Sequence, residues 1–236
     1  MKKIEVCYSP ALYPYFENKD ALVVVTDILR ASSAIVTAFM NGVDKIIPVG
    51  TLEEAKELKN RGYMVAAERD GIVRDFADFG NSPYNFTRER VAGKEIVYST
   101  TNGTHAIHMA ATGQQVLIGA YLNLSSLAEY LAAREEDVLV LCAGWKNKYN
   151  LEDTLFAGAL AQGVLSHGKH HTICDATLGA MDLFNLAKDD LMSYIEKVAQ
   201  RHRLRKNGLD DVIGYCHTQD LTQVIPVLEG DHLTVL

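Results

Sequence analysis

The sequence predicts an α/β fold in which helices are layered on a mostly parallel sheet. Short runs of β-branched and other apolar residues recur along the chain, and segments with helical periodicity separate them. The runs that indicate strands are 4–8, 21–26, 45–49, 64–67, 95–99, 115–119, 138–142 and 224–227. Alternation of this kind is typical of βαβ units, whose strands run parallel.

Helix start and stop signals support the segments between these strands. Thr51 is the expected N-cap of the first clear helix, because Glu54 follows three residues later and Gly62 provides the stop signal. Residues 123–136 and 151–168 have the periodicity of two further helices, and the second of them ends at a glycine.

The composition indicates one globular domain. The chain has 236 residues, of which 48% are hydrophobic, and it contains no Pro/Gly/Ser-rich linker, so we expect a single domain over residues 1–236. The net charge of -7 argues against a nucleic-acid partner. The basic residues form only one short cluster, which consists of Arg201, Arg203, Arg205 and Lys206.

Two further expectations concern location. No apolar run reaches the roughly 18 residues of a membrane span, so we expect no membrane partner. The N-terminus, with Pro10 and polar residues where a signal peptide has its apolar region, predicts a cytoplasmic protein.

Two stretches of the chain share a plan. Residues 23–50 and 95–122 each run from a strand through a polar loop and an apolar helix to a glycine, and then to a second strand. The similarity indicates either an internal duplication or the ordinary regularity of α/β units.

Most of the unusual polar residues follow the predicted strands. In open parallel sheets, ligands bind beyond the carboxyl ends of the strands. Carboxylates there suit Mg²⁺, and guanidinium groups suit phosphate oxygens, so the combination predicts a metal-assisted phosphoryl site. The residues concerned are Asp27, Arg30, Ser32, Ser33, Glu68, Arg69, Asp70, the segment Ser99 to Thr104, Glu152 and Asp153.

Each of these loops also has a purely structural explanation. The hydroxyls, Asn and Gly of residues 99–104 are preferred helix-capping residues as well as anion binders. Acids such as Glu152 stabilise the first turn of a helix through its dipole. Residues 79–86 are a turn by composition, in which Asn81 either packs within the loop or faces a ligand.

Taken together, the motifs resemble those of the 2-phosphosulfolactate phosphatase family. The resemblance spans roughly residues 1 to 230 and implies a three-layer α/β/α fold with a mixed, mostly parallel sheet, in a cytoplasmic homodimer. The motifs that carry it, in the order of the family, are DILRASS (27–33), NSP (81–83), STTNGT (99–104), CAG (142–144) and LED (151–153).

The resemblance also implies an activity and its residues. The activity is Mg²⁺-dependent hydrolysis of 2-phospho-3-sulfolactate, a small phosphoester, to 3-sulfolactate and phosphate. The implied metal ligands are Asp27, Glu68, Glu152 and Asp153. The implied substrate contacts are Arg30, Ser32, Ser33, Arg69, Asn81, Ser99, Thr100, Asn102, Gly103 and Thr104. The implied catalytic residues are Asp27 and Asp153.

Two mechanisms are compatible with these residues. In the first, a water activated by Mg²⁺ attacks phosphorus, with Asp153 as its base. In the second, Asp27 attacks phosphorus and forms an aspartyl phosphate, which water then hydrolyses. The DxDxT motif of haloacid-dehalogenase phosphatases is missing, because position 29 is Leu29, and this favours the first mechanism.

Two other functions fit the same motifs. The chain could be a phosphatase of this fold that acts on a different small phosphorylated hydroxy acid. It could also be a non-catalytic relative that binds anions without hydrolysing them.

Overall fold

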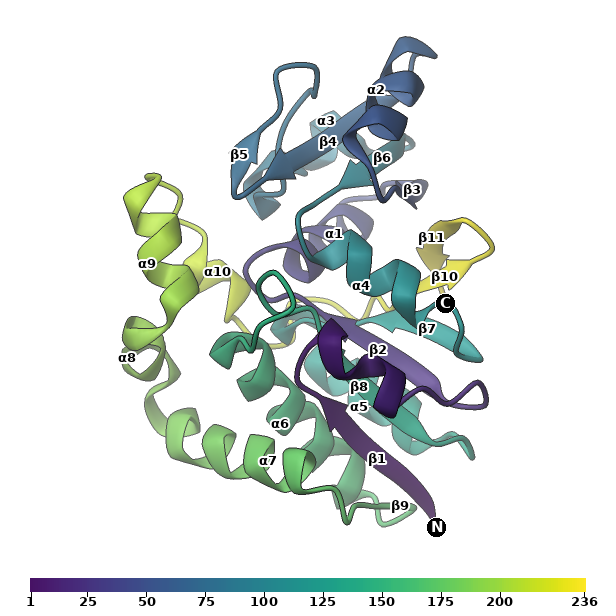
Figure 1. Cartoon of the computed structure of the whole chain (residues 1–236), viewed down its shortest axis with the longest axis vertical. Helices are drawn as coiled ribbons and strands as arrows, with labels where there is room; N and C mark the ends of the chain where they lie inside the picture. Colours follow the sequence, from purple (N-terminus) through teal and green to yellow (C-terminus); the bar gives the residue numbers. More distant parts are fainter.

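The computed structural model describes residues 1–236 and contains an eleven-stranded sheet with helices on both faces (Figure 1). The strands are β1 (Lys2–Cys7), β2 (Leu22–Thr26), β3 (Lys45–Pro48), β4 (Met64–Arg69), β5 (Ile72–Val73), β6 (Glu95–Ser99), β7 (Gln115–Ile118), β8 (Val138–Cys142), β9 (His170–His171), β10 (Pro226–Glu229) and β11 (His232–Val235). The α-helices are α1 (Ala31–Met40), α2 (Leu52–Asn60), α3 (Arg88–Val91), α4 (Gly103–Ala110), α5 (Leu124–Ala132), α6 (Leu151–Ser166), α7 (Asp175–Ala187), α8 (Leu191–Tyr194), α9 (Ala199–Lys206) and α10 (Ile213–Cys216). The short 3-10 helices are η1 (Pro10–Tyr15), η2 (Pro83–Asn85), η3 (Tyr121–Asn123), η4 (Lys188–Asp190) and η5 (Ile195–Lys197).

The sheet consists of two parallel blocks joined by a hairpin. Its strand order is β5-β4-β6-β3-β11-β10-β7-β2-β8-β1-β9. The strands run parallel within β4-β6-β3, the β4 block, and within β7-β2-β8-β1-β9, the β2 block. The antiparallel hairpin β10–β11 joins the blocks, through the pair Val227 and Leu117 on one side and the pair Leu233 and Ile46 on the other.

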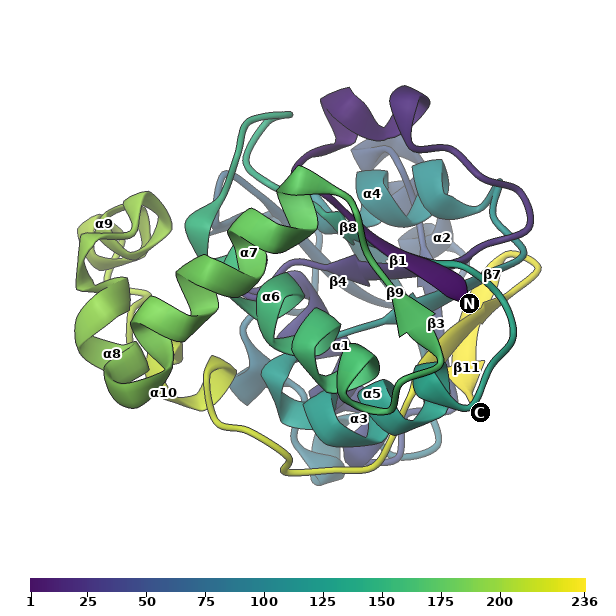
Figure 2. The ribbon, with the colours of Figure 1, turned by 90° about the horizontal axis from the view of Figure 1, so that it is seen from below.

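The layers confirm the predicted fold class. Figure 2 shows α4 on one face of the sheet, and α1, α5 and α6 on the other. A single large cluster of 60 buried apolar residues fills the space between these layers. None of the helices combines the length and the apolar character that crossing a membrane would require.

The central elements are apolar on all sides because neighbours cover them on all sides. Every residue of β2 is buried, as expected for an inner parallel strand with helices on both faces. Helix α6 packs between α5 and α7, and most of its residues are buried. A side chain at Gly158 would place its Cβ 2.1 Å from the Ala180 carbonyl oxygen, so this glycine permits the close approach of α6 and α7.

The eight predicted strands are all confirmed, with ends that shift by at most two residues. The three helices predicted from start and stop signals and periodicity correspond to α2, α5 and α6, and the apolar helices expected within residues 23–50 and 95–122 are α1 and α4. Thr51 caps α2 as expected, since its side-chain oxygen accepts a hydrogen bond from the Glu54 N–H at 3.1 Å.

The sequence patterns did not predict the helices between residues 175 and 216. Helix α9 buries only Gln200 and Leu204, so it lacks the apolar periodicity that reveals a helix. Helices α8, α9 and α10, residues 191–216, form a C-terminal limb at one side of the molecule, beyond the end of α7 (Figures 1 and 2).

The two stretches that share a plan cross between the blocks in opposite senses. The unit β2–α1–β3 leads from the β2 block to the β4 block, and the unit β6–α4–β7 leads back. The first turns of α1 and α4 meet, because a Cβ at Gly103 would lie only 2.5 Å from the Ala31 Cβ. The loops after β2 and β6 therefore come together, although the two blocks run in opposite directions.

Candidate active site

A narrow pocket lies where the first turns of α1 and α4 meet. It contains five of the residues predicted from the sequence, which are Asp27, Arg30, Glu68, Asn81 and Asn102. The other residues that line it are Leu29, Gly71, Trp145 and Gln200. A wider hollow, lined by residues 61–64 and 93–95, contains none of the predicted site residues.

Asp27 occupies the turn between β2 and α1. Its N–H donates to the Ser32 hydroxyl at 2.7 Å, and its carbonyl accepts from the Ser32 N–H at 2.9 Å, which closes the turn around the carboxylate. The pKa of Asp27 is raised to about 7, chiefly by burial and also by the nearby charge of Glu68, against the lowering effects of the Ala31 N–H and Arg30. Asp27 is therefore an acid that needs a cation or a proton.

Glu68 ends β4 and is held by backbone donors. Its Oε1 accepts from the Thr101 N–H at 2.8 Å, and its Oε2 accepts from the Gly71 N–H at 2.6 Å. The carboxylate thus joins the turn after β4 to the loop after β6. Because each of its oxygens already has a donor, Glu68 fixes the shape of the pocket as well as its charge.

Asp153, in the first turn of α6, joins two other loops. Its Oδ1 accepts from the Ile28 N–H at 2.9 Å, and its Oδ2 accepts from the Gly144 N–H at 3.0 Å. Burial, together with the charges of Glu152 and Asp27, nevertheless holds the pKa of Asp153 well above its usual range. Asp153 thus positions the loops after β2 and β8; its metal and base roles stay predictions.

Glu152 differs from the other acids because neither of its carboxylate oxygens has a hydrogen-bond partner. The residue is 1% exposed, and burial raises its pKa to about 7, with a further contribution from Asp27 and an opposing one from Arg203. An ionised carboxylate buried without a partner is strongly destabilising. The carboxylate of Glu152 therefore has the environment of a group that awaits a ligand.

Asp27 and Glu152 together fit a divalent cation. No three Asp, Glu, His or Cys side chains lie close enough to hold a metal ion by themselves. Mg²⁺, however, is often bound by only one or two carboxylates, together with waters and substrate phosphates. The unpaired oxygens of Glu152 and its repulsion with Asp27 match that requirement, whereas Glu68 and Asp153 use their oxygens to hold loops.

Arg30 and Asn81 are the predicted substrate contacts with the clearest position. Arg30 is 4% exposed, precedes the first turn of α1 and lines the pocket. The Oδ1 atom of Asn81 is buried in the same pocket without a partner, which favours the interpretation that Asn81 faces a ligand. A guanidinium beside the N-termini of α1 and α4 is a suitable environment for a phosphate.

Arg69 has a different position from Arg30. Its Nη1 donates to the Glu68 carbonyl at 2.7 Å, and its Nη2 donates to the Ser99 hydroxyl at 3.0 Å. The first bond lies within β4 and the second joins β4 to β6, and neither Arg69 nor Ser99 lines the pocket. Arg69 and Ser99 therefore support the site from behind, and direct contact with a substrate stays a prediction for both.

The remaining hydroxyl residues are bonded within their own turns. The Ser33 hydroxyl donates to the Ile28 carbonyl at 2.9 Å. The hydroxyls of Thr100 and Thr104 each accept from the other residue's N–H, at 3.1 and 3.2 Å. These bonds shape the turns before α1 and α4, and substrate contacts by Ser32, Ser33, Thr100, Gly103 and Thr104 stay predictions.

Four residues of the pocket lining were not predicted from the sequence, and Trp145 and Gln200 are two of them. Trp145 directly follows the CAG motif and is the only tryptophan of the chain, so its position beside a motif was a usable signal. Gln200 belongs to α9, which the sequence patterns did not predict, and it enters the pocket only through the fold of the C-terminal limb.

Comparisons with known proteins identify the family of the chain. The family model described as 2-phosphosulpholactate phosphatase matches residues 7–231. The chain belongs to the 2-phosphosulfolactate phosphatase family. A relative from Thermotoga maritima, named probable 2-phosphosulfolactate phosphatase, is 36% identical over 205 residues, which cover 87% of this chain and 88% of the relative. A relative from Clostridium novyi with the same name is 32% identical over 235 residues, which cover 98% and 99%.

Family membership confirms the resemblance drawn from the motifs. The match includes DILRASS, NSP, STTNGT, CAG and LED, all of which lie within residues 7–231. It also includes α9 and Trp145, so the C-terminal limb is part of the region that the family shares.

Proposed function

We propose that the protein is a Mg²⁺-dependent phosphatase that hydrolyses 2-phospho-3-sulfolactate to 3-sulfolactate and phosphate. Family membership supports the substrate, and one observation supports the metal. That observation is the buried Glu152 carboxylate, which has no hydrogen-bond partner and interacts electrostatically with Asp27; Asp27 and Arg30 line the pocket, whereas Glu152 is buried outside that lining. Asp27 and Glu152 would hold the ion.

Different side chains at the pocket would bind different parts of the substrate. When bound, Mg²⁺ would neutralise charge on the phosphoryl oxygens. Arg30 would hold one of these oxygens, and the positive ends of the α1 and α4 dipoles would favour the phosphate. Asn81, with its unpaired oxygen, would accept a hydrogen bond from a ligand hydroxyl or water.

The identity of the group that attacks phosphorus is a separate part of the proposal. Asp153 uses both oxygens to hold loop N–H groups, whereas the carboxylate of Asp27 has one weak bond, from the Ala31 N–H at 3.4 Å. Asp27 is thus the freer of the two acids to bind the ion or attack phosphorus. We retain the attack by water, and acid quenching during turnover tests it, because a phosphate covalently bound to the protein would overturn it.

Phosphate release tests the proposed activity. Wild-type protein should release phosphate from 2-phospho-3-sulfolactate with Mg²⁺, and chelation should abolish the release. Asp27→Asn should lower kcat at least about 100-fold while the circular dichroism spectrum stays unchanged, since the substitution removes a charge but little volume. The exposed Asp182→Asn serves as the control. Full activity after chelation would overturn the metal, and no release under any condition would overturn the phosphatase.

Two expectations from the resemblance remain predictions. A homodimer is one, and light scattering at micromolar concentration measures it directly. A cytoplasmic location is the other, and fractionation of the source cells would test it.

A further inference from the structure

Arg203 on α9 is joined to the pocket by a chain of two hydrogen bonds. Its Nε donates to the Gln200 Oε1 at 2.6 Å. The Nε2 of Gln200 in turn donates to the Leu29 carbonyl at 3.2 Å. Gln200 and Leu29 both line the pocket, so the guanidinium of Arg203 is held at its edge.

Trp145 holds the same guanidinium from another side. The Arg203 Cζ lies 4.3 Å from the centre of the Trp145 ring, which is a cation–π contact. In the orientation set by Gln200 and Trp145, the Nη2 atom of Arg203 is buried and has no hydrogen-bond partner. Arg203 also interacts electrostatically with Glu152, so its charge acts on the interior of the site.

The charges of the proposed substrate require more than Arg30. The substrate carries a carboxylate and a sulfonate in addition to its phosphate. Arg69 donates to the Glu68 carbonyl and the Ser99 hydroxyl, and none of its nitrogen atoms is buried without a partner. Arg203 does not itself line the pocket, but it is bonded to Gln200 and packs on Trp145, which do, and its buried Nη2 has no partner, so it is the cation best placed for a second acid group.

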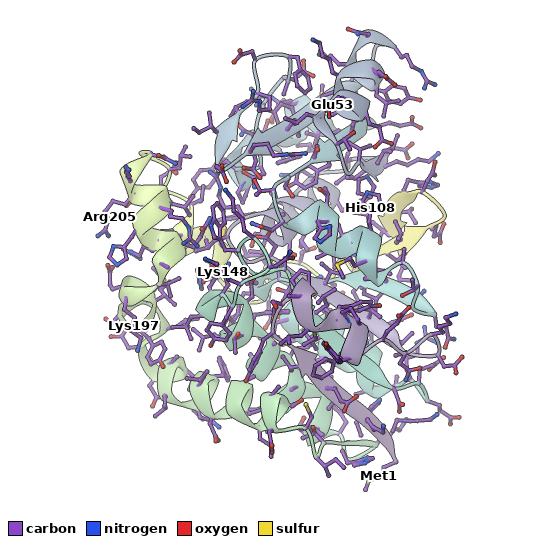
Figure 3. All side chains as sticks on the ribbon, viewed as in Figure 1. Met1, Glu53, His108, Lys148, Lys197 and Arg205 are labelled. Atoms are coloured by element: carbon purple, nitrogen blue, oxygen red, sulfur yellow. The ribbon has the colours of Figure 1, made fainter.

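The other basic residues of the same cluster have other partners. Arg205 bonds Asp210 at 3.3 Å, and its side chain is 51% exposed on the outer side of α9 (Figure 3). Arg201 forms an ion pair with Glu196 and acts electrostatically on His217; its Nε and Nη1 atoms are also buried without partners, but no hydrogen bond joins it to a residue of the pocket lining. Within the basic cluster between residues 201 and 206, Arg203 thus differs from Arg201 and Arg205 because it is bonded to Gln200 and packs on Trp145, two residues that line the pocket.

We propose that Arg203 is a specificity-determining residue that binds the non-phosphoryl acid group of the substrate, the sulfonate or the carboxylate. The inference rests on the proposed function and deepens it. Gln200 and Trp145 act as positioning residues for this guanidinium. An anionic oxygen of either group would accept a hydrogen bond from Nη2. Substrates that lack one of the two groups show which of them Arg203 binds.

Three substrates and three proteins make the test. The substrates are 2-phospho-3-sulfolactate, 2-phospholactate, which lacks the sulfonate, and the phosphate ester of 2-hydroxyethanesulfonate, which lacks the carboxylate. The proteins are wild type, Arg203→Ala and the control Arg205→Ala. Arg203→Ala should raise KM for the full substrate about 10- to 100-fold, as expected for the loss of a charge-assisted hydrogen bond, while kcat changes little.

The truncated substrates identify the group that is bound. If Arg203 binds the sulfonate, Arg203→Ala should not change the KM for 2-phospholactate. If it binds the carboxylate, the substitution should not change the KM for the ethanesulfonate ester. An equal rise in KM for all three substrates would overturn the inference and leave Arg203 as a counter-ion of Glu152. If wild type hydrolyses none of the three, the proposed function fails, which is a different result.

Binding of the product gives a readout that does not depend on turnover. Trp145 is the only tryptophan, so its fluorescence reports on the environment of Arg203. Titration with 3-sulfolactate should change the emission of wild type and Arg205→Ala, and the Kd should rise about 10- to 100-fold in both Arg203→Ala and Arg203→Lys. An unchanged Kd in the folded Arg203→Lys protein would overturn the inference.

Discussion

At the scale of single residues, the site is defined by which acids have partners and which do not. Glu68 and Asp153 accept backbone N–H bonds with both oxygens, so they fix the loops around the pocket. Glu152 accepts none, and Asp27 accepts only a weak one. The same four residues, equivalent as carboxylates in the sequence, thus have two kinds of role in the structure.

The first prediction concerns the stability of the metal-free protein. Burial raises the pKa of Glu152 from 4.5 to about 7, so the folded state binds more protons than the unfolded state between these values. Stability should therefore fall as pH rises through this window, and Glu152→Gln should remove about 1–3 kcal/mol of that fall. Urea unfolding at pH 5 and pH 8 measures it. The exposed Glu135→Gln should behave like wild type, and identical pH slopes for wild type and Glu152→Gln would contradict the prediction.

The second prediction concerns the pH dependence of activity. Cation binding requires Asp27 and Glu152 in their ionised forms, and the pKa of each is raised to about 7. At limiting Mg²⁺, kcat/KM should rise with pH through this region. Because the cation favours the ionised forms, more Mg²⁺ should move the midpoint to lower pH, by about one unit per tenfold if one proton is displaced. A midpoint that does not move with Mg²⁺ would exclude these acids as ligands.

At the scale of elements, the meeting of α1 and α4 forms the pocket. Each helix follows a strand of a different block, and each directs the positive end of its dipole to the meeting point. Gly103 permits the contact, because an added Cβ would lie 2.5 Å from the Ala31 Cβ and 3.1 Å from the Asp27 Oδ2. The glycine of the STTNGT motif is thus required by close packing.

Gly103→Ala tests this contact. The methyl group would force α1 and α4 apart and displace Asp27, so we expect a loss of about 1–3 kcal/mol in unfolding free energy and a larger proportional loss of activity. Gly214→Ala in α10 is the matched control, because nothing lies within 4 Å of a Cβ there. Urea unfolding measures the loss of stability, and phosphate release measures the loss of activity. Wild-type values of both for Gly103→Ala would show that α1 and α4 can move apart without loss of stability or activity.

At the scale of the whole molecule, a C-terminal hairpin holds together two blocks of strands that run in opposite directions. Strands β10 and β11 lie between β7 and β3, although they are the last strands of the chain. The site depends on this arrangement, since Asp27 comes from the β2 block and Glu68 from the β4 block.

Leu233→Ala tests the role of the hairpin. Leu233 is completely buried and pairs with Ile46 of β3, so its truncation should lower the unfolding free energy by about 2–5 kcal/mol. Leu236→Ala, whose side chain is 51% exposed, should have little effect. If the hairpin did not contribute to the stability of the sheet, the Leu233→Ala protein would unfold at the same urea concentration as wild type.

Local residue patterns were enough to predict the strands and the polar groups that follow them. Runs of apolar, β-branched residues indicated eight strands, because such residues favour the strand conformation and the core. The motifs after these strands named Asp27, Arg30 and Glu68 as one site, but the rule for parallel sheets does not bring them together: the β2 and β4 blocks run in opposite directions, and the contact of α1 with α4 joins their loops.

The different environments of the carboxylates could be found only from the tertiary structure. Hydrogen bonds from distant loops occupy the oxygens of Asp153 and leave those of Glu152 free, and no local pattern records such long-range pairing. The sequence patterns also failed to predict helix α9, which carries Gln200 and Arg203, because few of its residues are buried. Its position depends on long-range contacts of these two residues with Leu29 and Trp145. Burial and partnership depend on the whole fold, whereas propensity and periodicity depend on neighbours in the chain.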